Sequence, residues 1–343
     1  MRPRLHPMLV NGRSGDPALY IETLFEKHAI LFDLGDISPL SPRKVQRVEH
    51  VFVSHAHIDH FFGFDRLLRL LVGREKKVAL YGPIGLIDHV HHKLQAYRWN
   101  LFDRYVSDLV FGVTELASSS ERRVAQFRLK NAFAAEPIGT EAIAEKVICS
   151  EPCFQVSAAI LEHGTPCLAF AIEEAAHVNV WKSRLAELGL PIGPWLRELK
   201  QAVIEGRPGH HLFRVPVGSC KTREMPLAAL TGVLTVTAGQ KIAYVTDAAD
   251  TAANRTAIIS LVRNADLLFI EAAFARADAG LASERSHLTT AAAGTIARDA
   301  QVRRVEPFHF SARYEGQEQR MLNEVCAAFA GGCSQPQDGG PEP

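Results

Sequence analysis

The stretch SHAHIDHFFGF at residues 54–64 places three histidines and one aspartate within six residues. It directly follows the apolar, β-branched segment VEHVFV at residues 48–53, which has the character of a buried strand. The four polar residues are His55, His57, Asp59 and His60. A turn with a purely structural role would use Gly, Asn or Pro instead. The alternative is a solvated turn, but the spacing favours a metal site at the end of a strand.

Imidazole and carboxylate side chains spaced two residues apart project together from a turning loop. His55 and His57 can therefore bind one metal ion, while Asp59 and His60 turn toward a second position. Zinc takes histidine nitrogen and aspartate oxygen at about 2.0–2.2 Å, and catalytic zinc sites keep a position for water. Two ions about 3.5–4 Å apart can share one hydroxide and stabilise both oxygens of a phosphoryl displacement. Such a dinuclear site needs more ligands than these four.

Three further residues with metal-binding side chains stand where apolar strands end. His163 lies in the turn LEHGTP, Asp247 ends the segment IAYVTD, and His309 lies in PFHFSARY. Taken singly, each is better explained as an ordinary turn residue. Together, and all at strand ends, they favour a site with two metal ions.

The composition excludes several classes of protein. The 343 residues suffice for one large domain or two smaller ones. Lys and Arg number 38, as do Asp and Glu, so a polyanion would need a local basic patch. The start MRPRLHPMLVNG lacks the apolar segment of a signal peptide, and no apolar run is long enough for a membrane span. Six dispersed cysteines without a CxxC pair predict a reduced, cytoplasmic protein.

Strand-like and helix-like segments alternate along most of the chain, beginning with a predicted hairpin over 18–25 and 29–35. The other predicted strands are 48–53, 77–82, 109–116, 124–133, 154–163, 167–174, 241–247, 267–274 and 302–310. The predicted helices are 62–71, 84–97, 252–264 and 289–300. Strands in two sets, with the helices outside them, predict an α/β (α+β) fold of two sheets packed face to face, with helices on both outer faces.

Two segments depart from this alternation. Residues 176–215 predict an inserted arm of two helices, 177–189 and 195–206, separated by the Pro/Gly segment PIGP. The Gly/Pro-rich tail 331–343 predicts disorder. The sequence therefore predicts one domain over residues 1–330 that includes the arm.

The remaining motifs predict no site. His89, His91 and His92 share one predicted helix without a carboxylate partner, which is typical of a solvated helix face. His210 and His211 lie in a Gly-flanked loop. The segment GSCKT at 218–222 lacks the spacing of a phosphate-binding loop, and neither GxSxG nor GxGxxG occurs.

Five stretches together resemble the metallo-β-lactamase superfamily and, within it, ribonuclease Z, the endonuclease that trims the 3′ trailer from precursor tRNA. They are SHAHIDHFFGF, LEHGTPCLAF, LGLPIGPWLRELKQAVIEG, HLTTAAAGTIA and HFSARY, in the family's order between residues 48 and 314. The third is similar to the Gly-Pro segment near the family's tRNA-binding arm. The resemblance implies an αββα sandwich with a dinuclear zinc site and an inserted helical arm.

The same resemblance implies a role for individual residues. One metal ion would be bound by His55, His57 and His163, and the other by Asp59, His60 and His309, with Asp247 bridging. Asp59 would also steer the attacking water, and His287 would protonate the leaving 3′ oxygen with Glu271 orienting it. The residues expected to bind phosphate or RNA are Arg313, Ser311, Lys182, Arg197 and Lys200.

The main hypothesis from the sequence is a metal-dependent phosphodiesterase that cleaves precursor tRNA. Two Zn²⁺ ions are the expected cofactors, although His and Asp also suit Mn²⁺ or Fe²⁺. A second hypothesis is a hydrolase of the same scaffold that acts on a small ester, thioester, lactone or cyclic nucleotide. A third is a non-catalytic binding module with a decayed site. Nothing in the sequence supports it, because none of the proposed ligand positions is substituted. Relatives with such an arm commonly form homodimers, so we expect a cytoplasmic homodimer that binds RNA and no membrane.

Overall fold

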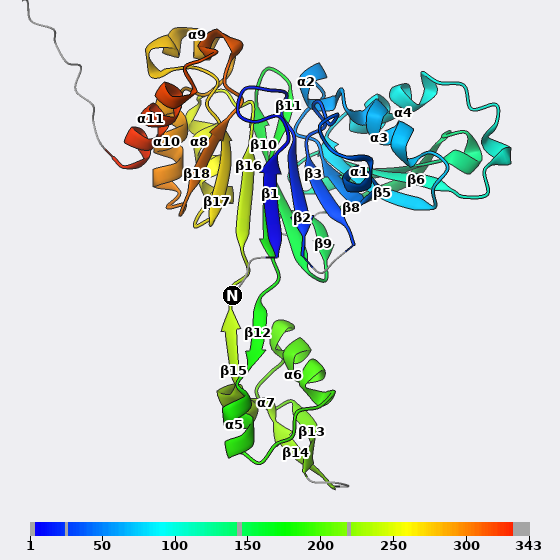
Figure 1. Cartoon of the computed structure of the whole chain (residues 1–343), viewed down its shortest axis with the longest axis vertical. Coiled ribbons are helices and arrows are strands. Elements are labelled where there is room, and N and C mark those ends of the chain that lie inside the picture. Colours follow the sequence, from blue (N-terminus) through cyan, green and yellow to red (C-terminus); the bar gives the residue numbers. More distant parts are fainter. Residues whose placement is uncertain (1–3, 25–26, 143–145, 218–220, 332–343) are drawn as a thin grey trace, which may run out of the picture. The chain divides into compact units, whose positions relative to one another are not determined.

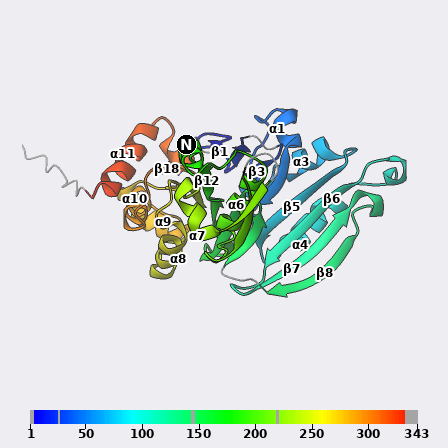
Figure 2. The ribbon, with the colours of Figure 1, turned by 90° about the horizontal axis from the view of Figure 1, so that it is seen from below.

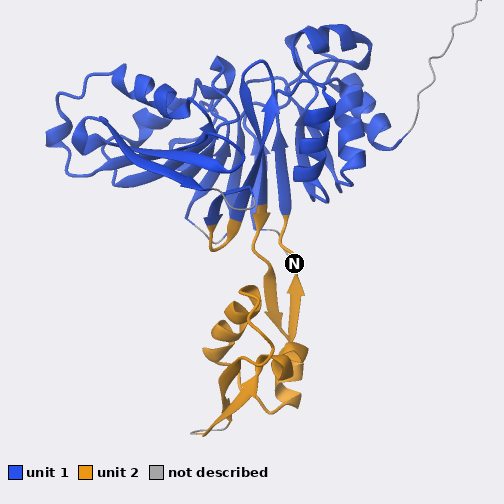
Figure 3. Cartoon of the chain, turned by 180° about the vertical axis from the view of Figure 1, so that it is seen from behind, with its two compact units in different colours: residues 1–150, 155–172, 241–343 blue, residues 151–154, 173–240 orange. Residues whose placement is uncertain are grey.

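Two β-sheets form the larger of the two structural units in the computed structural model, which describes residues 4–24, 27–142, 146–217 and 221–331. Unit 1 contains residues 1–150, 155–172 and 241–343, and unit 2 contains residues 151–154 and 173–240 (Figure 3). The predicted disordered tail lies, apart from Gly331, outside the described residues.

The first sheet has eight strands in the order β1 to β8 (Figures 1 and 2). Its strands are β1 (Leu5–Leu9), β2 (Leu19–Thr23), β3 (Ala29–Phe32), β4 (Val48–Phe52), β5 (Lys76–Pro83), β6 (Leu109–Leu116), β7 (Glu121–Arg128) and β8 (Ala135–Ala142). Strands β3 to β6 are parallel, and the outer pairs are antiparallel. The predicted hairpin is therefore confirmed as β2 and β3.

The second sheet has six strands in the order β18-β17-β16-β11-β10-β9. Its strands are β9 (Val147–Glu151), β10 (Phe154–Glu162), β11 (Pro166–Glu174), β16 (Lys241–Val245), β17 (Leu267–Glu271) and β18 (Val305–Phe308). Strands β16, β17 and β18 are parallel, so their carboxyl ends lie at one edge of the sheet. The sequence missed β8 because it is exposed along nearly its whole length, which leaves no apolar alternation to detect.

Helices cover the outer face of each sheet. In one apolar cluster, α1 (Pro42–Gln46), α3 (Phe64–Leu71) and α4 (Leu86–Gln95) pack on the first sheet. In another, α8 (Ala252–Val262), α10 (Thr290–Asp299) and α11 (Glu318–Phe329) pack on the second (Figure 1). The shorter helices of this unit are α2 (Ile58–Phe61), α9 (Ala279–Glu284) and the 3₁₀ turns Phe102–Arg104, Leu129–Asn131, Arg276–Asp278 and Ala312–Tyr314.

Aromatic side chains fill the space between the two sheets. Phe32 of β3 lies 5.0 Å from Phe52 of β4 and 5.6 Å from Phe170 of β11, measured between ring centroids. Tyr244 of β16 lies 5.7 Å from Phe32 and 5.2 Å from Phe308 of β18. Because side chains alternate along a strand, Leu31 points to the helices while Phe32 points to the other sheet. The αββα sandwich is thus confirmed, with one aromatic layer in its centre.

Unit 2 has a core of its own, built around Leu185, Trp195, Leu199 and Phe213. It contains β12 (His177–Val180) paired with β15 (Leu234–Thr237), β13 (Leu212–Val217) paired with β14 (Lys221–Pro226), α5 (Lys182–Glu187), α6 (Trp195–Ile204), α7 (Leu227–Leu230) and the 3₁₀ turn Thr231–Val233. The prediction of helix from residue 177 was wrong, because Val178 and Val180 belong to a strand that pairs with a segment more than fifty residues later. Within the described residues, no helix is both long and apolar enough to cross a membrane.

Candidate metal centre

The ligand-type residues of the sequence lie at the carboxyl ends of strands in both sheets. His55 and His57 follow β4, and His163 follows β10. Asp247 follows β16, and His309 directly follows β18. Asp59 and His60 lie in the one-turn helix α2, which begins right after His57. Ligand sites of sheets with parallel strands form at this edge, because consecutive carboxyl ends meet there.

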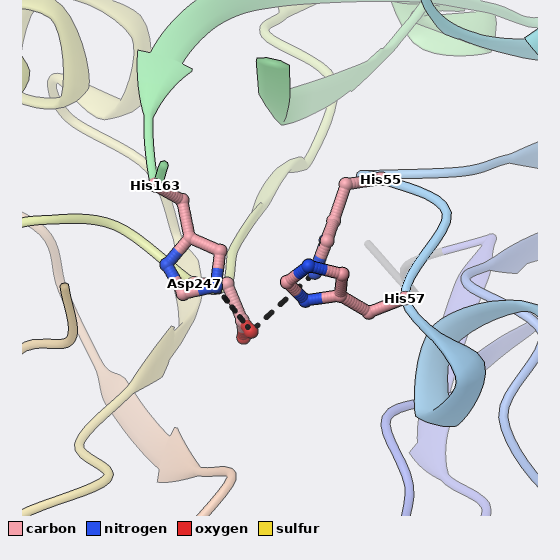
Figure 4. Close-up of side chains that lie close together, drawn as sticks. All are labelled: His55, His57, His163 and Asp247. Carbon is pink, nitrogen blue, oxygen red and sulfur yellow. Dashed lines mark ion pairs between the residues drawn. The ribbon is translucent and has the colours of Figure 1, made fainter. Parts of the chain in front are cut away.

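Folding gathers these residues into two groups that meet at Asp247. In the first group, one donor atom each from His55, His57, His163 and Asp247 lies within 4.8 Å of the others (Figure 4). In the second group, the donor atoms of Asp59, His60 and His309 satisfy the same condition. These are the two sets of three that the family resemblance implies, with Asp247 beside both.

The distances around Asp247 match those between ligands of a shared ion. Its Oδ2 atom lies 3.6 Å from His55 Nε2, 3.5 Å from His60 Nε2 and 3.3 Å from His163 Nε2. Two ligands at 2.0–2.2 Å from one tetrahedral ion stand about 3.3–3.6 Å apart. Among the described side chains, the buried Nε2 atoms of His55 and His60 have no hydrogen-bond partner. A buried nitrogen without a partner destabilises the folded protein, and a bound metal ion would provide that partner, so the donor set fits metal ions.

Hydrogen bonds at the opposite ring nitrogens fix how these imidazoles point. His163 Nδ1 lies 2.7 Å from the carbonyl oxygen of Ser286, which only accepts, so Nδ1 carries the proton. His60 Nδ1 likewise lies 2.9 Å from the Asp33 carboxylate. In both rings Nε2 keeps its lone pair for the centre. Outer partners of this kind set the tautomer and orientation of metal-binding histidines.

Asp33 is a site residue that the sequence analysis missed. It is completely buried, and its carboxylate also accepts hydrogen bonds from Ser54 Oγ and Tyr244 Oη, both at 2.8 Å. Its φ of 59° is unusual for a residue other than glycine, as are the values of 45° for Asp247 and 60° for His309. Asp33 follows the apolar strand β3, so the strand-end rule that found Asp247 would have found it as well.

The electrostatics of the centre favour a cation beside Asp247. Burial and then the neighbouring His60 lower the pKa of His55 to about 2, which keeps this imidazole neutral as a metal ligand must be. Burial alone would raise the pKa of Asp247, but His309 and His60 hold it well below its usual range. Burial opposes a proton on His309, yet the Asp247 carboxylate raises the pKa of that imidazole. Positive charge is therefore stabilised at this point.

His287 and Glu271 form an ion pair next to the two groups. His287 Nδ1 lies 2.9 Å from Glu271 Oε2, and the His287 ring lies 4.9 Å from that of His163. Burial lowers the pKa of His287, but the Glu271 carboxylate outweighs it and raises the pKa to about 9. Glu271 is held in place by the backbone N–H of Ala248, which donates to its other oxygen at 2.7 Å. The pair thus presents a protonated imidazole to the centre at neutral pH.

Comparison with known proteins shows the family. The model of the beta-lactamase superfamily domain matches residues 30–134 and 197–310. A ribonuclease Z from Deinococcus radiodurans is 30% identical over 305 residues, which cover 88% of either chain. The chain belongs to the ribonuclease Z family. Another ribonuclease Z, from Enterococcus faecalis, is 28% identical over 313 residues, which cover 89% of this chain and 84% of the relative.

Solved structures show the same fold. The short form of human tRNase Z superposes with a TM-score of 0.50 at 18% identity, covering 90% of this chain and 91% of that one. The metallo-beta-lactamase fold protein YhfI from Bacillus subtilis superposes with a TM-score of 0.51 at 14% identity, covering 95% and 94%. At these identities the likeness concerns the fold alone. Membership of the ribonuclease Z family makes the chain a metal-dependent hydrolase.

A cavity of about 290 Å³ opens beside the centre of this family member. Its walls include Asp59, His287 and His309, together with Asp16 from the β1–β2 loop and Arg285 just before His287. Ser311, expected to bind phosphate, also lines it. Arg313 is exposed in the next turn and is not among the described residues that line the cavity. The arginine on the cavity wall is instead Arg285.

The three arm residues proposed for RNA lie in unit 2. Lys182 and Arg197 are exposed, and Lys200 is half-buried. In unit 1, the histidines of α4 belong to none of the groups of donor atoms found among the described residues. His89 and His92 are exposed there, as expected for a solvated helix face.

Proposed function

We propose that this protein is a metal-dependent endoribonuclease that removes the 3′ trailer from precursor tRNA. The observation that supports this most strongly is the grouping of seven ligand-type residues around Asp247 in a chain that aligns with a ribonuclease Z over 88% of its length. The short form of human tRNase Z shares the fold. The proposed substrate is thus a long RNA and not a small ester.

Two metal ions, most simply Zn²⁺, fit the donor groups. His55, His57 and His163 would hold one, and Asp59, His60 and His309 the other, with Asp247 shared. When bound, such ions supply Lewis-acid stabilisation of the phosphate and lower the pKa of water. Imidazole and carboxylate ligands also suit Mn²⁺ and Fe²⁺, so the identity of the ions is decided by elemental analysis.

The protein's own residues then position the reactants. The Asp59 side chain is 37% exposed and lies 3.4 Å from His60 Nε2, so one carboxylate oxygen can accept a hydrogen bond from the attacking water. His287, protonated through Glu271, donates a proton to the 3′ oxygen as it leaves. Arg285 and Ser311 on the cavity wall bind the phosphate oxygens that do not react.

The experiment that tests the function compares two phosphodiesters. Purified protein reconstituted with Zn²⁺ is incubated with a precursor tRNA that carries a 3′ trailer and, separately, with bis(p-nitrophenyl) phosphate. We expect a single cut at the trailer junction and a far higher kcat/KM for the RNA. Hydrolysis of the small diester without any cleavage of the RNA would contradict the proposal and favour a small-molecule hydrolase.

We expect two metal ions per chain after reconstitution. Seven ligand-type residues exceed what one tetrahedral ion can use, and the donor atoms separate into two groups. Elemental analysis by plasma mass spectrometry measures the stoichiometry directly. A value that stays below one under saturating Zn²⁺ would show that the site is not dinuclear.

Replacement of His287 by Ala should lower kcat by about 10²–10⁴-fold, the usual effect of losing a positioned proton donor. The metal content should stay near that of the native protein, because the two donor groups proposed to hold the ions are complete without His287. His177, which pairs with Glu174 at 3.0 Å in unit 2, provides a matched histidine–glutamate control. Loss of the ions from the His287→Ala protein would identify His287 as a ligand, since it also lies within 4.8 Å of Asp247 and His309.

Replacement of Glu271 by Gln should move the alkaline limb of the pH–rate profile to lower pH. Glu271 is the group that raises the pKa of His287 to about 9, and burial alone lowers it. The native imidazole therefore keeps its proton up to about pH 9, and the variant loses it earlier. A profile of kcat against pH checks this. If the variant has a lower kcat but an alkaline limb at the same pH as the native protein, Glu271 only supports the fold.

We also propose that the protein is a cytoplasmic homodimer. The support for a dimer is an exposed apolar surface on α2, where the exposed fractions of Ile58 and Phe62 are 79% and 55% beside a cavity of about 330 Å³. Large exposed apolar residues of this kind are typical of protein interfaces. Light scattering of the native protein and of an Ile58→Lys, Phe62→Lys variant tests the assembly, since only the native protein should be dimeric.

A further inference from the structure

The loop between β1 and β2 is fixed against the metal centre by contacts at both of its sides. Asn11 Nδ2 donates to the backbone oxygens of Asp16 at 2.7 Å and Asp36 at 2.8 Å. The backbone oxygen of Arg13 accepts from Phe310 N at 2.9 Å, and its guanidinium binds the carbonyl of Pro307 at 2.5 Å. The loop therefore holds a set position relative to the end of β18, where His309 lies.

Glycine at position 35 lets this loop approach α2. A Cβ atom at Gly35 would stand 2.7 Å from Asp16 Cβ and 2.7 Å from the backbone oxygen of Asp59. Any larger residue would push the two segments apart, because real Cβ atoms are not found that close to other atoms. Asp16 is thus built into the wall of the 290 Å³ cavity that Asp59, His287 and His309 also line.

The Asp16 carboxylate is not used by any contact within the described part of the chain. It is half-buried, and within the described residues no group donates a hydrogen bond to it or pairs with it. Burial raises its pKa, and the carboxylates of Asp59 and Asp36 raise it further, which together outweigh the opposing effect of His60 and His309. It also lies outside the groups of donor atoms that fit metal ions. Because Asp16 lines the cavity, its carboxylate is available to a ligand that binds there.

A carboxylate at this place constrains the chemistry of the ligand. It only accepts hydrogen bonds, so it repels phosphate oxygens and attracts a neutral donor. The same cavity offers Arg285 and Ser311 to phosphate. RNA carries a 2′-hydroxyl beside every phosphate, and this hydroxyl is the group by which proteins distinguish RNA from DNA. Exocyclic amino groups of bases are the other donors of RNA.

We propose that Asp16 accepts a hydrogen bond from the 2′-hydroxyl of a nucleotide that flanks the scissile phosphate, and so makes cleavage depend on ribose. The inference rests on the proposed function and adds to it a residue that determines specificity. The favoured donor is the hydroxyl because it accompanies every nucleotide, whereas an amino group depends on which base stands there.

The test is a cycle of protein and substrate changes. Precursor tRNAs with a single 2′-deoxy nucleotide on either side of the junction are cleaved by the native enzyme, by the Asp16→Asn variant and by the Asp16→Ala variant. At the contacted nucleotide, the deoxy change should lower kcat/KM of the native enzyme about ten- to a hundredfold, the range for one hydrogen bond to a charged group. The Asp16→Ala change should lower kcat/KM by the same factor with the all-ribose substrate. In the Asp16→Ala variant, the deoxy change should then lower kcat/KM no further.

The Asp36→Asn variant is the matched control. The Asp36 carboxylate binds Ser38 N and Ser38 Oγ, both at 2.7 Å, and Asp36 is not among the described residues lining the cavity. This variant should keep the full ribose effect. Metal content and thermal unfolding of the Asp16 variants are measured alongside, and the nearly isosteric Asp16→Asn protein separates loss of the acceptor charge from misfolding.

Four outcomes would overturn the inference. The deoxy penalty could be as large in Asp16→Ala as in the native enzyme, or the variants could lose their metal ions, which would make Asp16 a ligand. The loss of kcat/KM that disappears in the Asp16→Ala variant could be the one caused by removing a base amino group, and not the one caused by removing the 2′-hydroxyl. Absence of any cleavage by the native enzyme would instead overturn the proposed function, and this inference with it.

Discussion

Replacement of Asp247 by Asn should abolish activity on both substrates, with kcat falling by about 10³-fold or more. Asp247 lies beside both donor groups, with Oδ2 at 3.3 Å from His163 Nε2 and Oδ1 at 3.2 Å from His309 Nε2. In the proposed dinuclear centre, the carboxylate would supply the buried negative charge that both ions share, and such ions typically contribute several kcal/mol of transition-state stabilisation. Elemental analysis should show fewer than two ions per chain.

Replacement of Asp247 by Asn, and not by Ala, separates the loss of the carboxylate from a change in backbone strain. Asp247 has a φ of 45°, and asparagine tolerates this left-handed region better than alanine does. Asp250, three residues later, is the matched control because its carboxylate pairs with Arg255 at 2.5 Å and belongs to neither donor group. Asp250→Asn should keep its metals and its activity. An Asp247→Asn protein with two ions and near-native turnover would exclude Asp247 as the shared ligand.

The sequence indicated which ligand-type residues gather in the fold, because residues of this kind at strand ends form a local pattern. Polar residues at the ends of apolar strands are visible in one dimension, and parallel strands bring their carboxyl ends together without further information. Asp33 also follows an apolar strand, β3, but its partners Ser54, His60 and Tyr244 are distant in the sequence, so its part in orienting His60 was not predicted. A buried carboxylate that orients a ligand has no spacing motif of its own, so only the structure reveals its role.

Most strands of the sandwich that are buried on one or both faces were predicted, whereas β1, β8 and β9 were missed. β4, fully apolar apart from two residues, was predicted nearly to its ends, whereas exposed β8 was not predicted at all. In unit 2 the prediction of helix over β12 failed for another reason. Its pairing with β15 depends on contacts across the whole unit, and such long-range pairing overrides local helix preference.

The boundaries of unit 2 determine how its role can be tested. Glu174 N donates to Gln240 O at 2.9 Å, so the two ends of the inserted segment adjoin. Removal of residues 178–212 alone would separate β15 from its partner β12 and delete α6 from the shared core. The segment to replace is therefore 176–238, which a short Gly/Ser linker can close without disturbing β11 or β16.

This replacement should lower cleavage of precursor tRNA by on the order of 10²–10³-fold, through loss of several phosphate contacts. Residues 176–238 hold eight basic side chains against four glutamates: Lys182, Arg184, Arg197, Lys200, Arg207, Arg214, Lys221 and Arg223 against Glu187, Glu198, Glu205 and Glu224. Binding energy from a remote contact benefits a long RNA and not a small diester. Hydrolysis of bis(p-nitrophenyl) phosphate should therefore stay within about tenfold of the native rate.

A milder variant, in which Lys182, Arg197 and Lys200 become Gln, keeps the fold of unit 2 and removes three charges. Each lost phosphate contact reduces the slope of log kcat/KM against log salt by somewhat less than one, so the variant should show a shallower salt dependence for the RNA alone. If both activities fall together in the excised protein while its metals remain, the unit supports the structure of the catalytic part. If neither activity falls in the excised protein, phosphate contacts in this unit do not contribute to RNA binding. The hypothesis of a small phosphodiester as the substrate is then favoured.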